Sequence, residues 1–142
     1  MSVQRVLYSN ATDNWETPQY LFDELNKEFA FGVDVCASEE NAKCQMFFDV
    51  NDNGLIQEWE GYGAVWCNPP YGRQIAQWVK KASESKCTTV MLIPARTDTQ
   101  WFHDYVYQKP NIEIRFVKGR IKFGEAKNSA PFPSMILVFR NA

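Results

Sequence analysis

The sequence predicts an α/β domain with a mostly parallel, doubly wound sheet that ends in an antiparallel edge. Two continuous apolar segments of strand length, 64–67 and 88–94, alternate with segments of helical periodicity. Buried strands that alternate with helices are typical of a parallel sheet, whereas the run of strand-like segments near the C-terminal end favours antiparallel pairing. A length of 142 residues suits a single domain, 1–142.

In the first half of the chain, Thr17 is expected to be the N-cap of a helix and Pro18 its first residue. The apolar residues that follow have helical spacing: Leu21, Phe22, Leu25 and Phe29. Segments 32–37 and 45–49 are predicted strands. The segment 64–67 is predicted to be a buried strand, because it is too short for a helix and is followed by two prolines.

In the second half, an amphipathic helix is expected over 75–82, followed by a buried strand at 88–94 and a helix at 99–108. The remaining predicted strands are 112–117, 120–123 and 135–139. Three of the five tryptophans are assigned to the core because of their apolar spacing: Trp59, Trp66 and Trp78. His103, the single histidine, is expected to be structural.

The composition excludes several classes of protein. With 45% hydrophobic and 23% charged residues the chain is neither disordered nor coiled coil, and a net charge of −2 argues against a histone-like binder. No apolar leader or membrane-length segment is visible, so a cytoplasmic protein without a membrane partner is expected. The four cysteines form no C-x-x-C pair, which predicts reduced thiols and no metal site.

Ligands of doubly wound sheets bind at the carboxyl ends of the strands. This rule places three segments on one rim of the predicted sheet: 34–38, 68–71 and 94–98.

The motif that predicts a chemical reaction is Asn68-Pro69-Pro70-Tyr71, which directly follows a predicted strand. Two prolines force an extended, rigid turn, which can aim the Asn68 side-chain oxygen and the Pro69 carbonyl at one external amino group. Tyr71 can stack on a planar ring that carries this amino group. Two acceptors would make the conjugated nitrogen more tetrahedral and turn its lone pair toward a methyl donor, without a strong base. The alternative is a structural proline turn that ends a strand.

Five motifs together resemble the phage-type DNA N6-adenine methyltransferases (Dam-type), in the order of that family and over nearly the whole chain. They are W-x-T-P-x-x-L-F at 15–22, D-V-C-A-S-x-x-N at 34–41, V-W-C-N-P-P-Y at 65–71, L-I-P-A-R-T-D-T-x-W-F at 92–102 and G-R-I-K-F at 119–123.

The resemblance implies a shortened, Rossmann-like class I methyltransferase fold that uses S-adenosylmethionine to methylate N6 of adenine in DNA. Asn68, Pro69, Pro70 and Tyr71 would bind the target adenine, flipped out of the duplex. The implied cofactor residues are Trp15, Thr17, Pro18, Asp34, Cys36, Ala37, Ser38 and Asp49. The alternative for Asp34 and Asp49 is that they are ordinary strand-end residues near solvent. Trp15 either caps the cofactor or packs against the first helix.

Basic residues give candidate DNA contacts at Arg73, Arg96, Arg120 and Lys122. Arg115, Lys118, Arg120 and Lys122 place four cations within eight residues, which fits a phosphate-contacting hairpin and a solvated hairpin equally. So small a chain offers little surface for gripping DNA and could recruit a second copy, and the sequence leaves monomer and homodimer both open.

Two other functions share these features. Protein glutamine N-methylation uses the same NPPY motif on a planar amide, and a catalytically inactive module could bind DNA or cofactor without turnover. The resemblance itself implies a bacteriophage or prophage protein in the setting of restriction–modification, acting in the cytoplasm of a bacterial host.

Overall fold

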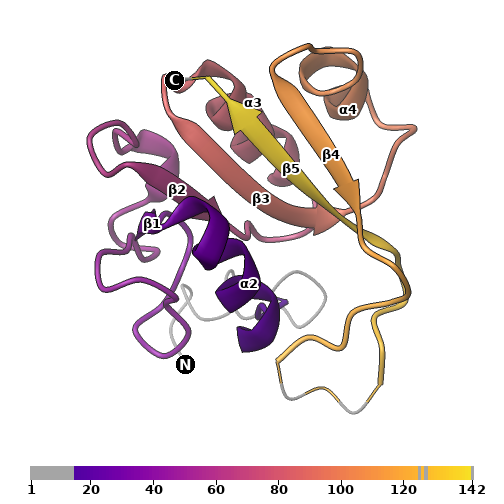
Figure 1. Ribbon diagram of the computed structural model, residues 1–142, viewed down its shortest axis with the longest axis horizontal. Helices are drawn as coiled ribbons and strands as arrows, with labels where there is room; N and C mark the ends of the chain where they lie inside the picture. The colour runs from indigo at the N-terminus through magenta and orange to yellow at the C-terminus, as the bar shows by residue number, and fades with distance from the viewer. Residues whose placement is uncertain (1–14, 125, 127, 142) are drawn as a thin grey trace.

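The computed structural model describes residues 15–124, 126 and 128–141, and these form one five-stranded sheet with helices on its two faces (Figure 1). The strands are β1 (Phe31–Asp34), β2 (Ala64–Cys67), β3 (Thr88–Pro94), β4 (Ile112–Phe116) and β5 (Ser134–Arg140). The helices are α2 (Gln19–Phe29), the short 3₁₀ helix η1 (Gly54–Ile56), α3 (Ile75–Glu84) and α4 (Gln100–Tyr105).

The sheet order is β1-β2-β3-β5-β4. β1, β2 and β3 pair in parallel, and β5 is antiparallel to both of its neighbours, β3 and β4. The sheet is therefore mostly parallel, and the antiparallel pairing predicted for the closing strands is confirmed at the β5–β4 side of the sheet, where β5 is interior and β4 is outermost. The burial of the two strands explains this: β5 is buried from Ser134 to Phe139 and suits an interior position, whereas β4 is half exposed and suits an edge.

The helices cover both faces of the sheet. α2 lies in front of the sheet in the view of Figure 1, and α3 and α4 lie behind it. Phe22 of α2 packs against Trp66 of β2, with ring centroids 5.5 Å apart, and Trp78 of α3 stacks on Trp59 at 6.2 Å. All three tryptophans assigned to the core are buried, which confirms that prediction.

Five predicted elements differ from the structure. The strand predicted at 32–37 ends at Asp34. The segment 45–49 forms only an isolated bridge between Phe47 and Asp34, and 120–123 is not a strand. α4 ends at Tyr105, several residues before the predicted end. The N-cap of α2 is Pro18 and not Thr17, because the Thr17 hydroxyl bonds to Asn68 instead.

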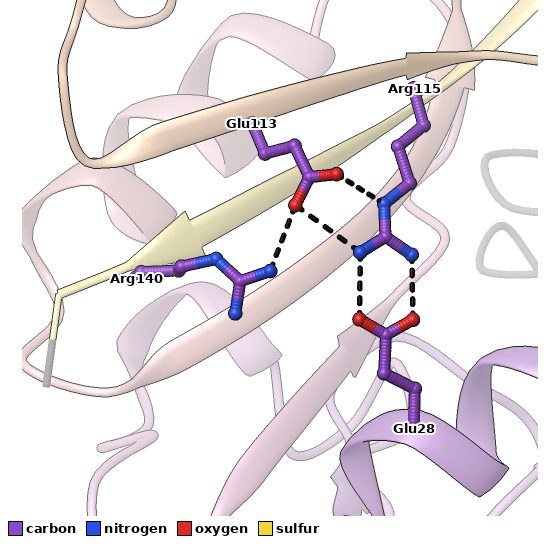
Figure 2. Close-up of polar contacts among 4 residues, drawn as sticks. All are labelled: Glu28, Glu113, Arg115 and Arg140. Carbon is purple, nitrogen blue, oxygen red and sulfur yellow. Dashed lines mark hydrogen bonds and ion pairs between the residues drawn. The ribbon is translucent and has the colours of Figure 1, made fainter.

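An ion-pair cluster joins the C-terminal end of α2 to β4 and β5 (Figure 2). Arg115 donates to both carboxylate oxygens of Glu28, each at 2.7 Å, and its Nε donates to Glu113 at 2.7 Å. Arg140 donates to the other oxygen of Glu113 at 2.8 Å, and both guanidinium groups lie over the Phe29 ring. Arg115 is thus engaged in ion pairs and is not one of the free cations expected of a DNA-contacting hairpin.

We expect this cluster to make the fold sensitive to acid. Hydrogen bonds from Arg115 and then Arg140 lower the pKa of Glu113 from 4.5 to about 2. A carboxyl whose pKa is lowered in the folded state stabilises the fold above its unfolded pKa, and this contribution is lost as the pH falls from about 4.5 toward 2. Because the Glu113 and Arg115 side chains are 42% and 31% exposed, each pair should contribute less than about 1 kcal/mol.

Chemical denaturation of wild type and Arg115→Met between pH 2 and 6 measures this effect. The variant should lose part of the pH dependence in that window. Lys27→Met is a matched control, since it removes the fully solvated Lys27–Glu24 pair, whose side chains are 74% and 70% exposed. Equal pH profiles for the two variants would contradict the assignment.

Candidate active site

A cleft of about 1030 Å³ opens beside the carboxyl ends of β1 and β2. Its walls come from 15–17, from 34–41 after β1, from 48–55 and from the turn after β2, and the first turns of α3 close it. Two of the three segments predicted to share a rim, 34–38 and 68–71, contribute to the cleft. The third, 94–98, does not line it.

Asn68 follows β2 directly and is held in one orientation. Its Nδ2 donates to the carbonyl of Trp15 at 2.5 Å and to the Thr17 hydroxyl at 2.9 Å. The opposite atom of the amide, Oδ1, is buried and has no hydrogen-bond partner among the described residues. A buried acceptor without a partner is costly, and this one belongs to a residue that lines the cleft.

Pro69 and Pro70 both line the cleft beside Asn68. Tyr71 does not. It is 1% exposed, its hydroxyl donates to the Leu92 carbonyl at 2.9 Å, and its ring packs edge-on against Phe123 and Phe132. The Tyr71 ring does not line the cleft here, because Phe123 and Phe132 pack against it, and its stacking on a base stays a prediction.

Asp34 ends β1 and organises the loop that follows it. The side chain is 2% exposed, and its two oxygens accept from the backbone N–H groups of Cys36 at 3.3 Å and Lys43 at 3.0 Å. Burial raises the pKa of Asp34 from 3.8 to about 7, since removal from water penalises the charged form. Asp34 thus shapes one wall of the cleft by bridging both ends of the 36–43 segment.

The residues implied as cofactor ligands are brought together, with one exception. The cleft is lined by Trp15, Thr17, Asp34, Cys36, Ala37, Ser38 and Asp49. Pro18 instead lines a smaller adjacent pocket. Trp15 also packs edge-on against Phe123 and Phe132, so the same ring contacts the cleft and the 120–133 segment.

Sequence reasoning missed part of the cleft wall. Trp78, assigned to the core, is buried but also lines the cleft, and its Nε1 has no acceptor among the described residues. Gly54 lies against it: a Cβ there would be 2.0 Å from the Val35 carbonyl oxygen and 3.0 Å from the Trp78 ring. Gln74 and Gln77 complete this side. The sequence did contain a signal for Gln74 and Trp78: they are four residues apart, at the start of the predicted helix that directly follows the proline turn.

The predicted DNA-contacting residues lie outside the cleft lining. Arg73, Arg96, Arg120 and Lys122 are all exposed. His103 is also exposed and one of its ring nitrogens bonds to the Thr97 carbonyl at 2.9 Å, away from the cleft. Throughout the described ranges, no three His, Cys, Asp or Glu side chains are grouped so that they could hold a metal ion. None of the helices in those ranges is long and apolar enough to span a bilayer.

Comparison with known proteins identifies the family. The model of the family described as "DNA N-6-adenine-methyltransferase (Dam)" matches residues 5–142. The chain is 31% identical over 137 residues to a DNA N-6-adenine-methyltransferase of Haemophilus phage HP1, a match that covers 89% of this chain and 78% of that protein. It is 37% identical over 94 residues to a DNA N-6-adenine-methyltransferase of Escherichia phage T1, which covers 63% of this chain and 39% of the relative. The chain belongs to the DNA N-6-adenine-methyltransferase (Dam) family.

Proposed function

We propose that the cleft binds S-adenosylmethionine together with one adenine of DNA, and that the Asn68 side chain receives the amino group to be methylated. The observation that carries this proposal is the buried, unpartnered Oδ1 of Asn68 on the cleft wall. Membership of the Dam family makes adenine N6 the acceptor and DNA the substrate, and it favours this reaction over glutamine methylation. We further propose that the sheet is a shortened Rossmann-like class I methyltransferase core.

The cleft fits these two occupants in size and chemistry. A site for one small molecule measures about 300–1,000 Å³, so a cleft of about 1030 Å³ has room for a cofactor and a flipped base. The Glu39, Glu40 and Asp49 side chains line it with carboxylates, which suit a ligand that carries cationic groups. The unpartnered Nε1 of Trp78 supplies a donor for a ring nitrogen or hydroxyl of either occupant.

The residues of the cleft would favour the reaction as follows. S-adenosylmethionine supplies an electrophilic methyl group on its sulfonium when bound. The Asn68 Oδ1 accepts one N–H of the adenine amino group, and the Pro69 carbonyl accepts the other. Two hydrogen bonds favour a pyramidal nitrogen with its lone pair directed at the methyl carbon. The amino nitrogen would take the methyl group that bound S-adenosylmethionine supplies and would then release one proton to water. No side chain of the site needs to act as a strong base.

Labelled S-adenosylmethionine and unmodified DNA test the proposal directly. We expect the label in DNA, on N6-methyladenine after nucleoside digestion. Label in protein would favour glutamine methylation. Cofactor binding without label transfer to any substrate would favour an inactive module, and either result would overturn the proposal.

Thr17 is expected to act as a positioning residue for Asn68. Its hydroxyl accepts from Nδ2 at 2.9 Å and so keeps Oδ1, rather than the amine, directed at the substrate. Thr17→Val preserves the shape but removes the acceptor, and loss of one such hydrogen bond (about 1 kcal/mol) should lower kcat roughly fivefold to tenfold. Thr17→Ser keeps the hydroxyl and should retain most of the activity. Equal kcat values for the valine and serine variants would contradict this role.

A further inference from the structure

β4 is one outer strand of the sheet, and β1 is the other (Figure 1). β5 pairs with one side of β4 in a regular register from Ile112↔Phe139 to Phe116↔Met135. In the part of the chain that the structure describes, no second strand pairs with the other side of β4. The strand therefore ends the sheet with an open row of backbone groups.

The hydrogen-bond pattern shows which backbone groups belong to this open row. Arg140 N–H donates to the Asn111 carbonyl at 2.9 Å, and Val117 N–H donates to the Ser134 carbonyl at 3.0 Å. Because bonding alternates along an antiparallel pair, Glu113 and Arg115 also face β5. The backbone groups of Ile112, Ile114 and Phe116 consequently point away from the sheet, although the Ile112 N–H is already bonded to the Lys109 carbonyl at 3.1 Å.

The edge of β4 is only partly protected. Proteins commonly blunt an exposed edge strand with charged side chains, lysine above all, or with proline or a bulge. β4 has the sequence IEIRF, with no lysine or proline, and its register against β5 is unbroken. Its two charged residues, Glu113 and Arg115, are engaged in ion pairs with α2 and β5. Phe116, at the end of the strand, is 66% exposed, so the edge presents an apolar residue to solvent.

We propose that β4 is the interface of a homodimer in which it pairs antiparallel with β4 of a second copy about a two-fold axis through Ile114. The sequence of the strand is complementary to itself about this residue. Ile114 of one copy would face Ile114 of the other, Ile112 would face Phe116 of the other copy, and Glu113 would face Arg115 of the other copy. Ile112, Ile114 and Phe116 form the hydrogen-bonded pairs, so every open backbone group of these residues except the Ile112 N–H, which is bonded to Lys109, gains a partner.

The charges support the same pairing and disfavour its alternatives. Glu113 and Arg115 would meet as non-hydrogen-bonded neighbours, the pair type in which side chains approach most closely. A shift of the register by two residues in one direction would place the two Arg115 side chains opposite each other, and a shift in the other direction would do the same to the two Glu113 side chains. Either shift places like charges opposite each other. The cluster of Figure 2, built on Glu28, Glu113, Arg115 and Arg140, would become continuous across the interface.

This pairing leaves the active site open. The cleft lies at the β1 and β2 end of the sheet, and β4 is the opposite edge. A two-fold axis perpendicular to the sheet joins the two copies into one continuous sheet with a cleft near each outer end. Each dimer therefore has two clefts, and dimer formation does not change the residues that line them.

Cysteine cross-linking tests the register. In the proposed dimer the two Cα atoms at position 114 lie about 5.5 Å apart, within the range of a disulfide. Ile114→Cys should therefore give a covalent dimer under mild oxidation. Ile112→Cys is the matched control, because its two copies would lie about 14 Å apart along the strands. The wild-type chain under the same conditions measures the background from its own cysteines, of which Cys67 and Cys87 are buried.

Sedimentation of the unmodified chain tests the dimer itself. Wild type should sediment as a dimer at micromolar concentrations, and Phe116→Lys should shift it toward monomer, because a lysine at an exposed edge position opposes strand pairing. The proposal is overturned if wild type stays monomeric at all concentrations. It is overturned equally if the two cysteine variants cross-link to the same extent, which would indicate another interface or random collision.

Discussion

Asn68→Ala is expected to lower kcat for adenine methylation by about 10²–10³-fold, the range found when one preorganised hydrogen-bonding group of an active site is removed. The variant loses the buried Oδ1, which has no partner among the described residues and belongs to a residue that lines the cleft. Since this acceptor is proposed to bind the amino group, affinity for S-adenosylmethionine should change much less than kcat.

Two further variants separate this role from a structural one. Nδ2 of Asn68 ties Trp15 and Thr17 to β2, so truncation also loosens the N-terminal wall of the cleft. Asn68→Asp retains an acceptor at Oδ1 and loses the donor, and it should keep more activity than the alanine variant. Gln45→Ala removes an exposed amide that does not line the cleft and should be indistinguishable from wild type. If Asn68→Ala kept the wild-type kcat, Asn68 would not bind the reacting group.

Gly54→Ala is expected to give the largest loss of stability among single-methyl substitutions in the cleft wall. The added Cβ would lie 2.0 Å from the Val35 carbonyl oxygen, a backbone atom that cannot rotate away, and 3.0 Å from the Trp78 ring. Val35 is held by its N–H bond to the Trp66 carbonyl at 3.1 Å, and Trp78 is stacked on Trp59. Both neighbours would have to shift. Overpacking of this kind costs roughly 3 kcal/mol, which lowers Tm by about 10 °C in a domain of this size.

Gly61→Ala provides the matched control for this substitution. Nothing lies within 4 Å of a Cβ at Gly61, so its cost comes only from the positive φ of +96° and should be about 1–2 kcal/mol. Because Gly54 lines the cleft and Gly61 does not, Gly54→Ala should also weaken S-adenosylmethionine binding in calorimetry at a temperature where it remains folded. Equal Tm losses for the two variants would contradict the predicted clash, because they would show that the Val35 backbone can move away from the added methyl group at little cost.

Local sequence patterns predicted the strongly periodic or continuously apolar elements. β2, β3 and α3 lie where apolar runs and helical spacing placed them, because each buries most of its side chains and its pattern records that burial. The strand predicted at 45–49 was reduced to one bridge, since Phe47 pairs only with Asp34 and not with a continuous neighbour. Whether an extended segment becomes a strand depends on the partner that the fold places beside it.

The sequence by itself determined the family motifs, the rigid turn Asn68-Pro69-Pro70 and the polar residues that follow β1, because these depend on residue type and on short stretches of chain. Only the tertiary structure decided which atoms face the cleft. The Asn68 amide is oriented by residues more than 50 positions away, Tyr71 is turned into the core by Phe123 and Phe132, and Trp78 reaches the cleft wall from α3. Those contacts join segments far apart in sequence, so no local pattern contains them, and packing between the layers sets where each side chain points.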